Sequence, residues 1–287
     1  MESRCVEVVA GPAARVLETN APLVVVATFN RVVNLASPEG RLVAVHGKDV
    51  FLTPMSLSID SQSPWSGHCQ WCPGMELARV PGALVCREVV LDLTEASIWH
   101  PGVAWRPLAP SGREWLARLL VACIPPGLQA AGAGAVLWGG GEPDLTAACR
   151  RLMAGLSSKG GAIGAACDLV GMGPGLTPAG DDVLVGMALA AWSWLTGPAR
   201  DRTIVAVEAA AEWARTRSTV LGAEFLHHAA RGDFSQPLLE LANAAEAQDV
   251  TGVFARARTL VEQGGTSGVD TLTGMVMALQ AAGQGCP

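Results

Sequence analysis

The sequence contains no tyrosine and only two lysines, so its positive charge comes almost entirely from arginine. The formal net charge is -6, and no run of basic residues is longer than Arg150-Arg151. A nucleic-acid-binding face requires clustered basic residues, because it must neutralise phosphates. The composition therefore excludes nucleic acid as an expected partner.

Long apolar runs and a secretion signal are also missing. The longest apolar stretch, residues 183–195, falls short of the ~20 residues that a membrane-spanning helix needs. Residues 1–5 show no basic-then-apolar signal peptide. The eight cysteines are scattered along the chain, which without a secretion signal favours a reducing compartment. We therefore expect a cytoplasmic protein with no membrane partner.

The chain has abundant material for a core and changes its pattern once. Short apolar runs at residues 8–9, 23–28, 41–46, 50–52 and 84–93 alternate with turn signals and predict strands. Because short turns join them, an antiparallel sheet or small barrel is expected. Later, Ser111 and Glu114 have capping-box spacing before an apolar run. Helical spacing then recurs at residues 145–156, 181–195, 202–215, 219–230, 237–247, 253–263 and 269–282. The prediction is an α+β fold, with a β-rich domain at residues 1–108 and an α-helical domain at residues 109–287.

The most informative segment is residues 171–182, Gly-Met-Gly-Pro-Gly-Leu-Thr-Pro-Ala-Gly-Asp-Asp. Alternate glycines let a ligand approach the backbone closely. Thr177 stands where an N-cap would stand, and Pro178 at the first helical position. Amides at a helix N-terminus favour a phosphate or carboxylate. The predicted ligand-binding residues here are Gly171, Gly173, Gly175, Leu176, Thr177 and Gly180. Its Gly-x-Gly-x-Gly spacing is neither a Walker A loop nor a Rossmann fingerprint.

Asp181 and Asp182 complicate a simple anion loop. They would repel a bare anion, yet they could hold Mg²⁺, orient a cationic or amide group, or act as a base. Adjacent helical residues point about 100° apart, so one carboxylate can serve the ligand while the other caps or pairs structurally. We predict both as catalytic residues, with no cofactor beyond Mg²⁺. The alternative is a tight turn before a well-capped helix, whose acids complement the helix dipole.

A second glycine-rich segment, residues 264–274, has similar features. Thr266 or Ser267 is placed to cap the last helix, with Asp270 in its first turn. Two such helix N-termini could face one pocket and bind a small anionic or amide-bearing compound, or they could be independent helix starts. Further candidate ligand residues are Thr266, Ser267, Gly268 and Asp270. Asn30 and Asn34, four apart on a predicted strand, point to the same side and either bind ligand or tie down a turn.

These segments resemble the signature of the family of an oxamate carbamoyltransferase subunit of allantoin degradation, many of whose members have no known function. The resemblance covers residues 29–35, 171–182, 216–219 and 264–274 in the family's order. It implies carbamoyl transfer between oxalurate and phosphate, giving oxamate and carbamoyl phosphate, by several different subunits. The Ser-x-Arg-Thr motif of aspartate and ornithine carbamoyltransferases is absent, since Arg256 replaces the serine. The alternative function is a non-catalytic metabolite-binding or assembly subunit.

Two other patterns have weaker functional interpretations. Cys69 and Cys72 form a Cys-x-x-Cys beside His68, but a zinc site needs a further pair of ligands, so a strand-linking loop is expected. Glu224 and His228 share a helix face. The zinc-protease pattern is absent, so surface or helix-pairing histidines are expected there.

Overall fold

A computed structural model describes residues 2–19, 21–60, 71–87, 89–129, 131–158, 160–262 and 265–284. The chain divides into two compact units, Met1–Pro101 and Gly102–Pro287. The sequence places its boundary after residue 108. Each unit has its own hydrophobic core.

The first unit is an eight-stranded mixed barrel with a ninth strand added to it. The strands follow the order β5-β4-β3-β2-β6-β7-β8-β1, and β1 closes the barrel by pairing with β5. The ninth strand, β9, pairs with the C-terminal half of β1. The elements are β1 (Glu2–Ala10), α1 (Gly11–Leu17), β2 (Leu23–Thr28), β3 (Val32–Ala36), β4 (Leu42–Gly47), β5 (Ser56–Ile59), β6 (Glu76–Val80), β7 (Ala83–Cys86), β8 (Val89–Asp92) and β9 (Ser97–Trp99).

The barrel confirms the predicted β-rich domain, but its strands are not all antiparallel. The pairs β1–β8, β1–β9 and β4–β5 run parallel. The strand predicted at residues 50–52 is wrong: Val50 N–H donates to the Gly47 carbonyl at 3.1 Å, which closes a turn after β4. The strand that follows is β5, whose serines hid it from the apolar pattern although all four of its residues are buried.

The second unit is helical, so the α+β prediction is confirmed. Among the described residues, no helix is both long and apolar enough to cross a bilayer. The elements are α2 (Pro110–Ala122), the 3₁₀ helices η1 (Pro126–Leu128) and η2 (Gly132–Trp138), α3 (Pro143–Ser157), α4 (Ala162–Leu169), α5 (Ala179–Ser193), α6 (Gly197–Arg217), α7 (Val220–Ala229), α8 (Gln236–Glu246), α9 (Val250–Val261) and α10 (Ser267–Gln284). The predicted capping box is wrong, because α2 begins at Pro110 with Ala109 as its N-cap.

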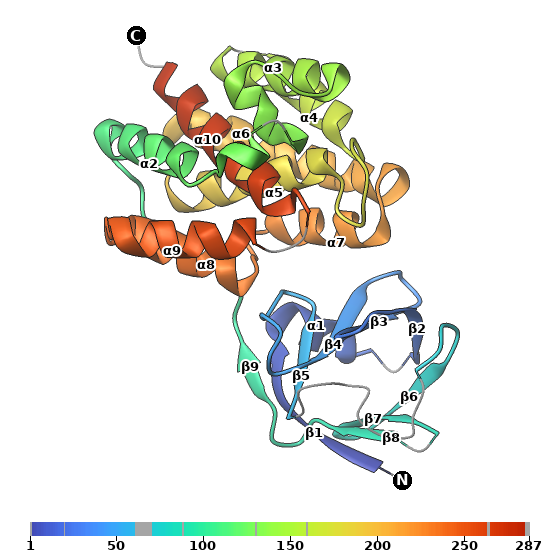
Figure 1. The fold of residues 1–287 in the computed structure, drawn as a ribbon. Helices are drawn as coiled ribbons and strands as arrows, with labels where there is room; N and C mark the ends of the chain where they lie inside the picture. Colours follow the sequence, from blue (N-terminus) through green and yellow to red (C-terminus); the bar gives the residue numbers. More distant parts are fainter. Residues whose placement is uncertain are drawn as a thin grey trace. The chain divides into compact units, whose positions relative to one another are not determined.

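Helix α5 is the centre of this unit and is buried along almost its whole length. It makes its most extensive contact with α10, which crosses it in the middle of the helical unit (Figure 1). Two glycines allow the backbones to touch. A Cβ on Gly186 would lie 1.9 Å from the Thr271 carbonyl oxygen, and one on Gly274 would lie 1.9 Å from that of Val183. The two glycines lie about two turns from the N-termini of their helices.

Candidate functional site

The glycine-rich loop connects α4 to α5. Its central residues, 173–176, are exposed, and Leu176 is 55% exposed. Gly173 and Gly175 have φ values of 101° and 103°, a region that other residues rarely adopt. The predicted capping is off by one residue: Pro178 is the N-cap and α5 begins at Ala179. The reason is that the Thr177 hydroxyl contacts another segment instead of the helix start.

Asp181 is held by the protein on both carboxylate oxygens. Oδ1 accepts the Gly171 N–H at 2.8 Å, and Oδ2 accepts the Ser218 hydroxyl. The side chain is buried, and burial raises its pKa more than these two hydrogen bonds lower it. This carboxylate therefore ties the start of the loop to the connection between α6 and α7.

Asp182 joins the two glycine-rich segments. Its Oδ2 accepts the Ser267 hydroxyl from the first residue of α10. The Ser267 oxygen is also 2.5 Å from the Thr177 hydroxyl of the loop. Thr177, Asp182 and Ser267, three residues that the sequence predicts as functional, thus form one hydrogen-bonded group, which we call the bridging trio. The two helix starts are adjacent, not independent.

The electrostatics of Asp182 are unusual for a carboxylate. The pKa of Asp182 is raised to about 8, first by burial and then by the negative charges of Asp270 and Asp181, against the lowering effect of the Ser267 and Thr177 hydroxyls. Asp182 is still 8% exposed, whereas Asp181 is 1% exposed and Asp270 is fully buried. Of these three residues, Asp182 keeps the largest exposed fraction.

Asp270 interacts with a segment that the sequence analysis did not single out. Its Oδ1 accepts the Ala133 N–H at 2.6 Å, at the start of η2. Its Oδ2 lies in the interior with no partner in hydrogen-bonding geometry among the described residues. Burial raises the pKa of Asp270 to about 6, more than the nearby Thr266 hydroxyl and the Ala133 and Gly134 amides lower it. The neighbouring Cys149 thiol is also buried, and its pKa is raised to about 12.

Some predicted ligand residues lie in packed surroundings. A Cβ on Gly180 would lie 2.0 Å from the Leu169 carbonyl oxygen, and one on Gly268 would lie 2.0 Å from that of Leu260. Both glycines are buried helix contacts.

Asn34 is buried on β3, but Asn30 is exposed in the turn before it, so the prediction that both lie on one strand is wrong. The chain turns at Asn30, because the Phe29 N–H donates to the Val32 carbonyl.

The other candidate groups have structural surroundings. His228 and Glu224 are both buried on α7 and lie 3.4 Å apart, so they pair along the helix and are not surface residues. Cys72 is exposed and free, whereas His68 and Cys69 lie outside the described residues. The described part of the chain holds no group of three or more His, Cys, Asp or Glu side chains arranged for a metal ion. Mg²⁺ at Asp181 and Asp182 stays a prediction.

The sequence analysis missed two parts of this arrangement. Ser218 and Thr219 contact the loop, and they stand inside the segment 216–219 that carries the family resemblance. The start of η2 contacts Asp270, and the density of glycines in residues 132–141 is the signal that could have found it.

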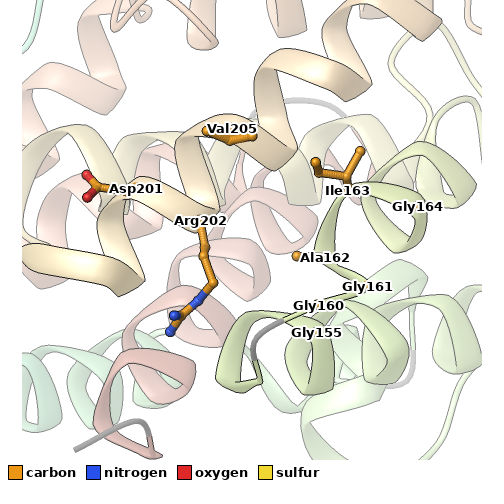
Figure 2. Close-up of a pocket in the computed structure, with 9 residues that line it drawn as sticks. All are labelled: Gly155, Gly160, Gly161, Ala162, Ile163, Gly164, Asp201, Arg202 and Val205. Atoms are coloured by element: carbon orange, nitrogen blue, oxygen red, sulfur yellow. The ribbon is translucent and has the colours of Figure 1, made fainter.

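A separate cavity of about 340 Å³ lies between the α3–α4 connection and α6 (Figure 2). Gly160 and Gly161 of that connection line it, together with Ile163 of α4 and with Arg202 and Val205 of α6. The Arg202 Nε–H donates to the Leu156 carbonyl at 2.8 Å, so part of this guanidinium closes the end of α3. No predicted site residue lines the cavity, which is distinct from the loop.

The fold is that of a two-unit α+β protein. Its helical unit carries buried carboxylates that are hydrogen-bonded to hydroxyls at two adjacent helix starts. The comparisons are consistent with this class. Residues 7–98 match the AllH family N-terminal domain, and residues 169–279 match oxamate carbamoyltransferase subunit AllH. The chain belongs to the AllH family, and the second match contains the loop, Ser218, Thr219 and the start of α10. No solved structure matches the chain.

Proposed function

We propose that this protein is a catalytic subunit of an oxamate carbamoyltransferase-type enzyme, acting in the cytoplasm together with other subunits. The reaction converts oxalurate and phosphate to oxamate and carbamoyl phosphate. Its small carbamoyl- and carboxylate-bearing ligands would bind at the exposed loop residues 173–176 and at the bridging trio. The observation that carries the proposal is the trio itself, because it joins both glycine-rich segments to a carboxylate with an unusually high pKa.

The reaction needs a proton donor and an anion site. Phosphate oxygen attacks the carbamoyl carbon of oxalurate, the bond from that carbon to the oxamate nitrogen breaks, and the nitrogen takes up a proton. With a pKa of about 8, Asp182 carries a proton at neutral pH and can supply it to the leaving nitrogen. The reverse reaction uses the carboxylate as the base. Protonated Asp182 also removes the repulsion that an ionised carboxylate would exert on an anion.

The test is reconstitution of the purified protein with its partner subunits, oxalurate and phosphate, with carbamoyl phosphate formation as the readout. We expect turnover with the wild-type chain and a loss of about 10²–10⁴-fold with Asp182→Asn. Oxamate binding should persist in this variant, because asparagine keeps the size of the side chain and an oxygen that accepts from Ser267. No carbamoyl phosphate with any subunit combination would refute the proposal.

The second candidate is a non-catalytic subunit that binds a metabolite or assembles the enzyme. The exposure of Leu176 at the loop tip favours it, because an exposed apolar side chain beside a site suits a partner surface. In that case Asp182→Asn would leave turnover by the complex intact, and changes at the loop would reduce ligand binding or assembly alone.

A further inference from the structure

The connection between α6 and α7 contacts the loop near both of its ends. At the first end, the Ser218 hydroxyl donates to Asp181, whose other oxygen accepts from Gly171. At the second end, the Thr219 hydroxyl donates to the Leu176 carbonyl. Between these contacts lie the exposed residues 173–176. Two hydroxyls adjacent in sequence therefore contact the loop on both sides of its exposed residues.

The packing around these hydroxyls leaves little room for movement. A Cβ on Gly171 would lie 2.2 Å from the Arg217 carbonyl oxygen, so the loop start touches the last turn of α6. A Cβ on Gly222 would lie 2.5 Å from Asp181 Oδ2 and 2.8 Å from the Ser218 hydroxyl oxygen. The first turn of α7 therefore presses against the same carboxylate.

The two sides of the Leu176–Thr177 peptide are held by different helices. Thr219 holds the Leu176 carbonyl from the start of α7, and Ser267 holds the Thr177 hydroxyl from the start of α10. Rotation of this peptide would break at least one contact. Its orientation sets the direction of the Thr177 N–H and constrains the adjoining exposed residues 173–176, where we propose that the ligand binds.

We infer that Ser218 and Thr219 are positioning residues for the ligand loop, with Ser218 acting through Asp181 and Thr219 acting on the Leu176 carbonyl. Asp181 is then a positioning residue as well, and the chemistry falls to Asp182 alone. The inference rests on the proposed ligand site for its effect on binding. Its structural part, the hold on the loop, stands independently of any ligand.

Thr219 permits a substitution that separates its two roles. Its oxygen also accepts the Gly222 N–H at 2.9 Å and so caps α7. In Thr219→Asp the carboxylate keeps the cap but cannot donate to Leu176, whereas Thr219→Asn keeps an acceptor and a donor. The matched control is Asp249→Ala, which removes an equivalent cap from α9, where Asp249 accepts the Gly252 N–H at 2.9 Å.

The experiment measures amide hydrogen exchange at Gly173, Gly175, Leu176 and Thr177, together with binding of carbamoyl phosphate and oxamate to the full chain. Thr219→Asp should speed loop exchange and weaken binding about tenfold, while Thr219→Asn and Asp249→Ala stay within about twofold of wild type. In the reconstituted enzyme, Thr219→Asp should raise KM and leave kcat nearly unchanged. Ser218→Ala should speed exchange at Gly171 as well.

The outcomes separate the two proposals. If wild type binds neither compound but Thr219→Asp still speeds loop exchange, the proposed function fails and the hold on the loop stands. If loop exchange in Thr219→Asp equals that in Thr219→Asn, the positioning role is refuted. A fall in kcat with unchanged KM would also refute it, because the residue would then act on the chemical step.

Discussion

Replacing Asp182 by asparagine should change how the stability of the helical unit depends on pH. The pKa of Asp182 is raised from the ordinary 3.8 to about 8 by burial. The folded chain therefore keeps this proton up to about pH 8, whereas the unfolded chain releases it near pH 4. The stabilisation that comes from protonated Asp182 is fully present below its pKa in the unfolded chain. It is lost as the pH rises towards its pKa in the folded chain.

The magnitude follows from the shift. One pKa unit corresponds to about 1.4 kcal/mol, so the whole window corresponds to on the order of 6 kcal/mol. Between pH 6 and pH 8.5 the part due to Asp182 is about 3 kcal/mol, because Asp270, with a pKa near 6, contributes mainly below this range. Asparagine carries no charge at any of these pH values. Asp182→Asn should therefore lack this fall in the free energy of unfolding.

The assay is guanidinium chloride unfolding, followed by helical circular dichroism at pH 6 and pH 8.5, with EDTA present. Asp168→Asn is the matched control, because Asp168 is an exposed aspartate paired with Arg151 on the surface of the same unit. Between pH 6 and pH 8.5, the free energy of unfolding of Asp182→Asn should rise by about 3 kcal/mol relative to that of wild type. An equal difference at both pH values would show that ionisation of Asp182 does not oppose folding, and would refute the argument from burial.

Three further predictions concern other parts of the chain. Burial lowers the pKa of His46, whose Nε2 is 2.7 Å from the Ser56 hydroxyl oxygen. The barrel should therefore lose stability as pH falls below about 6.5. His46→Asn should abolish that loss in unfolding measurements at pH 7 and pH 5. Gly186→Ala on α5 should destabilise the helical unit by about 2–3 kcal/mol in denaturant titrations. Gly283→Ala, at an open position of α10, should be neutral or stabilising, and equal effects of the two changes would contradict the close crossing. If Asp181 and Asp182 hold Mg²⁺, millimolar Mg²⁺ should raise the Tm of wild type at pH 8.5 but not that of Asp182→Asn, and an unchanged wild-type Tm would count against the cation.

The sequence was a good guide to the helical unit because its periodicity reports directly on buried helix faces. It also placed the two glycine-rich segments at helix starts, and the structure joins them through Ser267 and Asp182. The idea that neighbouring aspartates would have different partners agrees with the geometry, since Asp181 contacts Ser218. All of these features depend on spacing along one helix or on the ends of helices.

Features that depend on distant pairing could not be predicted in this way. The parallel β4–β5 and β1–β8 pairs follow from the strand order of the barrel, which apolar runs alone do not encode. The Ala133–Asp270 contact joins residues 137 positions apart. The N-cap was predicted at Thr177 because capping is a local rule, but the Thr177 hydroxyl hydrogen-bonds to Ser267, which is distant in sequence.

The crossing of α5 and α10 has a consequence for how changes far from the proposed ligand site would be observed. An α-helix rises about 1.5 Å per residue, so sliding α10 along α5 by a single residue would separate Ser267 from Asp182 by more than a hydrogen bond tolerates. The close contacts of Gly186 with Thr271 and of Gly274 with Val183 fix the register of the two helices and so oppose such sliding. A methyl group added at either glycine would disturb the alignment of Ser267 with Asp182 without contacting these residues. Inactive variants in the middle of these helices would then report lost alignment of the two helix starts, not lost chemistry.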